Sequence, residues 1–106
     1  MADTTSSRKP PQACADLTEL RAEIDRLDHD LVALLATRTG YVARAAQLKK
    51  NRAAIVDQAR IEQIIARVRS QAAGHGVEPE VIEAIYRAMI AAFIAYEERM
   101  FDRDKP

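Results

Sequence analysis

Two cations lie on the apolar side of a long amphipathic segment, and their positions suit them to bind an anion. Arg38 follows Leu31 by seven residues, about −20° around a helix, where the apolar pattern calls for another leucine. Lys49 follows eleven residues later, about three turns on, and so faces the same way. A cation on a packed face must be paired or must bind an anion, because burying an unpaired charge is costly. The spacing therefore predicts a buried site for an acidic ligand.

Three further charged residues are candidates for the same site. Arg21 lies about 100° from Arg38 around the helix, so it would reach such a pocket from a second chain rather than within its own. Arg60 lies in the first turn of a later helix, where the helix dipole disfavours a cation. Glu97 places a carboxyl on the inner face of the last helix. All three are also compatible with a solvated surface, and Arg38 and Lys49 could extend from the core into water.

Hydrophobic periodicity predicts the elements that carry these residues. Residues 17–50 form one long helix with a three–four apolar spacing, and a capping box of Asp16 and Glu19 precedes it. A second helix is capped by Asp57 and ends at the glycines of 74–76. A third runs from Pro79 to about residue 101. Since no β-alternation appears, the predicted fold class is all-α, a protomer of three helices with a long first helix.

The length of the first helix decides the expected oligomeric state. Thirty-four residues span about 51 Å, whereas a compact globule of 106 residues is roughly 33 Å across. The helix would leave its apolar stripe uncovered in a monomer, so we expect an intertwined homodimer closed by the shorter helices. A break near Gly40, giving a four-helix monomer, is the alternative. The leucine stripe of the first helix consists of Leu17, Leu20, Ile24, Leu27, Leu31 and Leu34.

Composition limits the function classes. Sixteen basic and sixteen acidic residues cancel, so nothing in the overall charge favours nucleic acid or an anionic membrane surface as a partner. No apolar run approaches the roughly 20 residues of a membrane span, and residues 1–15 lack the apolar core of a secretory signal. A single cysteine, Cys14, excludes an intrachain disulfide, and we expect a cytoplasmic protein.

The predicted organisation is a disordered tail (1–15), a helical domain (16–102) and a C-terminal tail (103–106).

No metal site is expected. Asp25, Asp28 and His29 form an i, i+3/i+4 cluster, but with one histidine a solvated helix face is the better interpretation. His75 stands between two glycines and is interpreted as a loop residue.

Longer strings of sequence resemble a known family. Residues 20–28 (LRAEIDRLD), 34–38 (LLATR) and Lys49 are similar to the all-helical chorismate mutase family, and the likeness continues through 55–60 (IVDQAR) and 89–97. It covers about residues 17–101. The ordered set of arginine, arginine, lysine, arginine and a terminal glutamate is more specific than LRxxID alone. The resemblance implies an intertwined three-helix dimer with two active sites, in agreement with the length argument.

The resemblance also implies roles for single residues. Arg38 and the partner's Arg21 would hold two substrate carboxylates, since a planar guanidinium forms two parallel hydrogen bonds with a carboxylate. Lys49 would donate toward the ether oxygen and a carboxylate, and Glu97 would contact the same ether oxygen from the other side. The remaining implied positions in the pocket are Asp57 near the substrate hydroxyl, Arg60, and the apolar Ile61 and Phe93.

The implied reaction is the Claisen rearrangement of chorismate to prephenate. Because it is pericyclic, it requires no nucleophile, metal or cofactor. The protein would hold the reactive conformer and stabilise negative charge on the ether oxygen as the C–O bond breaks. An ionised Glu97 would repel that oxygen, whereas the protonated acid would donate a hydrogen bond to it.

Two departures from the family pattern favour an alternative activity. Ile61 stands where many of these mutases carry a glutamate, and Phe93 where a serine often stands. Both make the pocket more apolar and resemble the sister isochorismate pyruvate lyase, which breaks the same ether bond and releases pyruvate. Asp57 and Glu97 favour the mutase.

A non-catalytic helical dimerisation or regulatory module is a further alternative. It predicts that Arg38 and Lys49 are paired within the protein, with no cavity between the helices. An enzyme instead predicts an enclosed cationic cavity.

Overall fold

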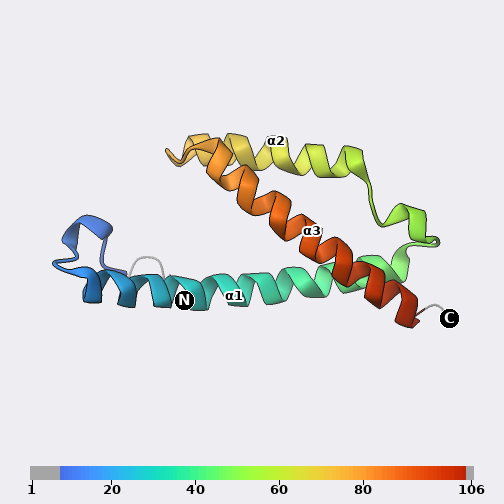
Figure 1. Cartoon of the computed structure of the whole chain (residues 1–106), viewed down its shortest axis with the longest axis horizontal. Helices are drawn as coiled ribbons and strands as arrows, with labels where there is room; N and C mark the ends of the chain where they lie inside the picture. The colour runs from blue at the N-terminus through green and yellow to red at the C-terminus, as the bar shows by residue number, and fades with distance from the viewer. Residues whose placement is uncertain (1–7, 105–106) are drawn as a thin grey trace. The chain divides into compact units, whose positions relative to one another are not determined.

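A computed structural model describes residues 8–104, which contain helices and no strand. The prediction of an all-α fold with three helices and a long first helix is therefore confirmed for this part of the chain. The chain divides into two compact units, Met1–Gly40 and Tyr41–Pro106. The elements, in order, are the short 3₁₀ helix η2 (Pro11–Ala13), α1 (Leu17–Leu48), the 3₁₀ helix η3 (Arg52–Ala54), α2 (Gln58–Gly74) and α3 (Pro79–Asp104) (Figure 1).

Helix α1 begins at the predicted capping box. The backbone N–H of Glu19 donates to Asp16 Oδ1 at 2.9 Å, and the Glu19 carboxylate accepts a 2.7 Å hydrogen bond from the N–H of Ala15. The first bond satisfies a first-turn donor that has no intrahelical partner, and the second ties the residue before the cap to the same turn. The helix runs without interruption through Gly40, so the alternative of a helix break near that residue is not observed. It ends at Leu48, two residues before the predicted end at residue 50.

The residues preceding α1 fold back along its first turns. Arg8 pairs with Asp30 at 2.9 Å, and the Lys9 ammonium pairs with Glu19. Residues 8–15 thus carry defined contacts and the η2 turn, although composition predicted a tail over 1–15. The first seven residues of that tail lie outside the described part of the chain.

In the second unit, α2 and α3 run in opposite directions from a short turn and pack against each other (Figure 1). Asp57 caps α2 as predicted, because its Oδ1 accepts from the N–H of Arg60 at 3.0 Å. Gly76 in the turn has φ +73°, a left-handed conformation that L side chains rarely adopt. Helix α3 continues to Asp104, beyond its predicted end near residue 101. The apolar core between the two helices is formed by Ile64, Ile65, Val68 and Ile90.

A charged belt runs along the surface of the same two helices. Arg87 on α3 pairs with Glu62 of α2 at 3.0 Å and with Glu83 at 2.7 Å. Arg69 on α2 pairs with Glu83 at 2.7 Å. Hydrogen bonds from the Arg87 guanidinium lower the pKa values of both carboxyls, and those carboxylates raise the pKa of Arg87. The belt therefore ties α2 to α3 over their apolar core.

Within residues 8–104, none of the helices combines the length and apolar character that crossing a membrane requires.

Candidate active site

Two of the predicted site residues form an ion pair in the second unit. The Lys49 ammonium nitrogen lies 2.6 Å from Glu97 Oε2. Lys49 directly follows α1, and its backbone N–H still donates to the carbonyl of Ala45 at 3.0 Å, so α1 sets where its side chain starts. Glu97 lies on α3, and its side chain is 9% exposed compared with 27% for Lys49. Residues separated by almost half the chain therefore bring a cation and a carboxylate together in a largely buried place.

This contact is an ion pair without the alignment of a hydrogen bond. Glu97 Oε2 is inaccessible to water and accepts no hydrogen bond of acceptable direction, although the ammonium lies within ion-pair distance. The attraction between the two charges is nevertheless strong at this distance, because it depends weakly on angle. The ammonium thus compensates a buried carboxylate that would otherwise be costly.

The remaining candidates of the second unit lie at the cap of α2, on α2 and on α3. Asp57 is exposed and engaged as the cap of α2. Arg60 is exposed, and its guanidinium donates to Gln63 Oε1 at 2.9 Å. Ile61 is half-buried and packs against the α2–α3 core. Phe93 is half-buried and lies four residues before Glu97 on α3, hence one turn away.

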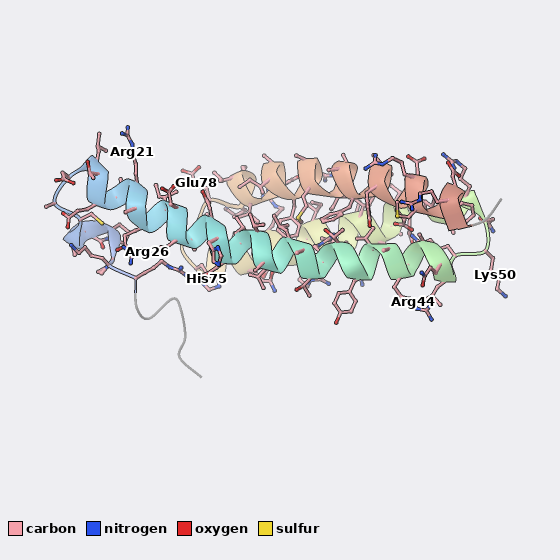
Figure 2. All side chains as sticks on the ribbon, turned by 90° about the horizontal axis from the view of Figure 1, so that it is seen from below. Arg21, Arg26, Arg44, Lys50, His75 and Glu78 are labelled. Carbon is pink, nitrogen blue, oxygen red and sulfur yellow. The ribbon has the colours of Figure 1, made fainter. Side chains whose placement is uncertain are left out.

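The two other candidate arginines belong to the first unit. Arg38 is half-buried and makes an interaction within the protein. Arg21 is exposed, and its side chain points away from α1 (Figure 2). The predicted convergence of Arg38 and Arg21 on Lys49 stays a prediction.

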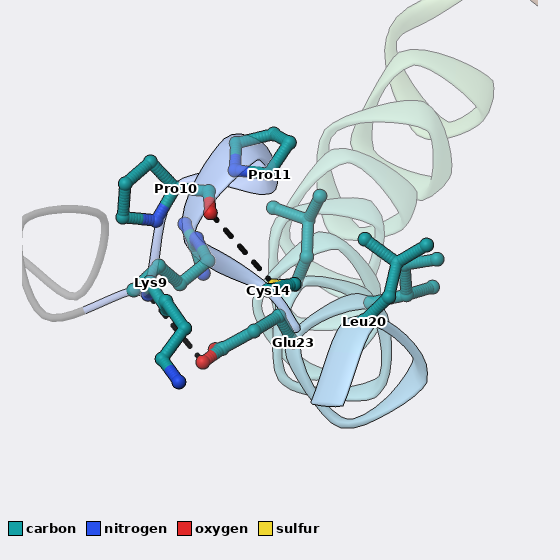
Figure 3. A pocket seen from close by; sticks show the side chains of 9 residues that line it. Lys9, Pro10, Pro11, Cys14, Leu20 and Glu23 are labelled. Carbon is teal, nitrogen blue, oxygen red and sulfur yellow. Dashed lines mark hydrogen bonds between the residues drawn. The ribbon is translucent and has the colours of Figure 1, made fainter. Parts of the chain in front are cut away.

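The first unit contains a cavity that none of the eight predicted site residues lines. It has a volume of about 370 Å³ and an opening to solvent, between residues 8–14 and the first turns of α1 (Figure 3). Its wall is mainly apolar, with Leu20, Ile24 and Leu27 on the helix side. Cys14 is also in the wall, and its thiol lies 3.8 Å from the carbonyl oxygen of Pro10. The cavity is open and mainly apolar, unlike the enclosed cationic cavity that the enzyme interpretation predicts.

Within residues 8–104, no three or more acidic, histidine or cysteine side chains lie close enough together to hold a metal ion. Asp25, Asp28 and His29 are all exposed on α1, as a solvated helix face requires.

Sequence reasoning missed one cation beside the Lys49–Glu97 pair. Arg52 of η3 contacts Asp102 and lies 3.7 Å from Glu98, both on α3. The signal was present in the sequence, since Glu98 and Asp102 are four residues apart and so share a helix face. What the sequence could not indicate is that this face lies opposite the connector between α1 and α2.

The fold and this ion pair define an all-helical protein with a lysine after its long first helix, facing a carboxylate near the end of its last helix. Comparison with known protein families identifies a family with this description. Residues 20–98 match the family described as chorismate mutase type II, and the chain belongs to that family. The resemblance inferred from the sequence is thereby confirmed.

One curated relative carries the name of the sister activity. The chain is 31% identical over 87 residues to an isochorismate pyruvate lyase from Pseudomonas aeruginosa. The match covers 82% of this chain and 86% of the relative. The two comparisons therefore establish the family, to which both the mutase and the lyase activities are related.

Proposed function

We propose that the protein is a chorismate mutase that converts chorismate to prephenate. The observation that supports this best is the family match over residues 20–98. Within that match, the sequence resemblance implies that Lys49 and Glu97, which lie 2.6 Å apart, contact the breaking ether bond. An ammonium beside the ether oxygen would stabilise the negative charge that develops there. A largely dry setting makes this stabilisation stronger than it would be in water.

The substrate would be held by arginines that reach it from two chains. Arg38 and the partner's Arg21 would each bind one substrate carboxylate, fixing the conformer whose reacting ends lie close together. Arg60 would line the pocket, and Asp57 would lie near the substrate hydroxyl. Ile61 and Phe93 would form its apolar wall.

The pairing of Lys49 has two interpretations. A non-catalytic module also predicts a paired lysine, so the pair alone does not separate the two classes of protein. In the enzyme, one ammonium can contact Glu97 and the substrate together, since it carries three donors. The family match, which covers residues 20–98, favours the enzyme.

We also propose that the active protein is a homodimer. The leucine stripe of α1 is largely uncovered in the single chain, with Leu31 50% and Leu34 68% exposed. Arg21, exposed near the start of the same helix, would be delivered to the partner's site by such packing. A cytoplasmic location also stays a proposal, which depends on the composition alone.

Isochorismate pyruvate lyase is the second candidate, and two observations favour it. The curated relative from Pseudomonas aeruginosa carries that name. Ile61 and Phe93 are half-buried apolar residues where many mutases carry polar ones. Salicylate and pyruvate would then be the products.

The deciding experiment supplies chorismate and isochorismate separately to the purified protein and identifies the products. Prephenate from chorismate supports the proposal, whereas salicylate plus pyruvate from isochorismate alone replaces it with the lyase. Consumption of neither substrate would leave the non-catalytic module.

Substitutions at single residues test whether that activity depends on the proposed site. Lys49→Met should lower kcat/KM by about 10²–10³-fold, the usual cost of removing one charge-stabilising donor. The neighbouring Lys50 is exposed and points away from the chain, so Lys50→Met is the matched control (Figure 2). Arg38→Ala should lose activity while keeping its helical circular dichroism, and Arg44→Ala, an exposed arginine on α1, should keep both.

A further inference from the structure

The last turn of α1 and the connector that follows it together determine where the Lys49 side chain begins. It contains one short turn, η3, in which Asn51 Oδ1 accepts from the N–H of Ala54 at 3.1 Å. Ile55 closes the turn and is 4% exposed. The Asn51 bond is local, joining residues three apart, and by itself does not fix the connector relative to α3.

Arg52 supplies a direct link between the connector and α3. Its guanidinium contacts Asp102 through one nitrogen and lies 3.7 Å from Glu98 Oε2 through another. Glu98 directly follows Glu97, and Asp102 lies one turn further along α3. The planar fork of one arginine thus spans two carboxylates beside the residue that pairs with Lys49.

We propose that Arg52 is a positioning residue that holds Lys49 against Glu97 by tying η3 to α3. As far as catalysis is concerned, the inference depends on the proposed function. Lysine has four rotatable side-chain bonds, so its ammonium stays in one place only if its backbone is held and its partner is near. Arg52, three residues after Lys49, ties that backbone to α3, the helix that carries Glu97.

The size of the effect follows from the exposure of the three side chains. Arg52 is 53% exposed, Glu98 39% and Asp102 58%, so solvent screens both contacts. An exposed pair contributes a factor of roughly two to five in an equilibrium constant. Arg52→Ala should therefore lower kcat/KM by about three- to tenfold, far less than removal of Lys49. Because exposed pairs weaken with ionic strength, the loss should also depend on salt.

Salt dependence separates positioning from a merely structural role. The ratio of kcat/KM between wild type and Arg52→Ala is measured from about 0.01 M to about 1 M KCl, over which the Debye length falls from about 30 Å to about 3 Å. The ratio should fall toward one as salt rises, even though substrate binding itself weakens in both proteins. Arg52→Lys should restore part of the activity, and Arg103→Ala, an exposed cation on α3, is the matched control.

A second measurement tests the inference without any substrate. Amide hydrogen exchange of residues 51–56 should be at least severalfold faster in Arg52→Ala than in wild type, with unchanged exchange in the α2–α3 core. The charge reversal Arg52→Glu should accelerate it further, and adding Asp102→Arg should slow it again. If neither chorismate nor isochorismate is consumed, the proposed function fails while this measurement still decides the inference. Equal exchange in wild type and Arg52→Ala would overturn it, as would an activity ratio that does not change with salt.

Discussion

Replacement of either partner of the Lys49–Glu97 pair should have unequal effects on stability. At 2.6 Å and an effective dielectric constant of about 20, the Coulomb attraction is about 6 kcal/mol. Desolvation of the two groups, several kcal/mol each, offsets most of it. The net effect of a substitution therefore depends on which charge is left behind and on how well water reaches that charge.

Lys49→Met leaves the Glu97 carboxylate, 9% exposed, without its counter-charge, and we expect a loss of about 2–4 kcal/mol in the free energy of unfolding. Glu97→Gln leaves an ammonium that is 27% exposed on a flexible stem and can turn into water. We expect that variant to lose about 1 kcal/mol or less. The double variant should lose less than the sum of the two, with a coupling of about 1–3 kcal/mol.

The assay is urea unfolding followed by far-UV circular dichroism at neutral pH and fixed protomer concentration, because dimerisation would make stability depend on concentration. Lys50→Met is the control for loss of a lysine and should change stability by less than about 0.5 kcal/mol. The reasoning is refuted if Glu97→Gln costs as much as Lys49→Met, or if Lys49→Met behaves like Lys50→Met.

Three further predictions concern the helices that carry the site. Gly40→Ala should raise stability by about 1 kcal/mol in thermal unfolding, since a Cβ there meets nothing within 4 Å; a loss would mean that a partner helix packs against Gly40. Asp57→Ala should cost about 1 kcal/mol in urea unfolding by removing the α2 cap, with Asp57→Asn near wild type. The lowered pKa values of Glu62 and Glu83 stabilise the fold above their ordinary value of 4.5, and this contribution is lost as pH falls through the lowered values. Stability of Arg87→Met, measured against pH, should therefore decline less below about pH 4.5 than that of wild type.

The elements could be predicted because each depends on local chemistry. The caps at Asp16 and Asp57 and the glycine beyond α2 lie where the residue types require them. The helix ends were less predictable: α1 ends at Leu48 and α3 extends to Asp104, since helix ends depend on tertiary contacts as well as on propensity.

The site was predictable only in part. A stripe position and a family resemblance pointed to Lys49 and Glu97, which the fold brings to 2.6 Å. Arg52 was not predicted because the spacing of Glu98 and Asp102 indicates a shared helix face but not that the connector lies opposite it. A contact between residues fifty positions apart, such as Arg52 with Asp102, depends on how helices pack. The cavity beside residues 8–14 was missed for a similar reason, since its wall includes a segment with no predicted structure.

The uncovered leucine stripe and the arginine expected from a second chain both require two chains to associate. Leu27 and Leu31 are about half exposed on α1, and apolar side chains so exposed at helical spacing favour association. If association also brings the partner's Arg21 to the substrate, then only the associated form holds both carboxylates. Specific activity should then fall on dilution in step with the dimer fraction measured by sedimentation. Leu31→Lys should abolish both together without touching a site residue. Full specific activity in a monomeric Leu31→Lys variant would show that one chain is sufficient and that Arg21 has no role across an interface.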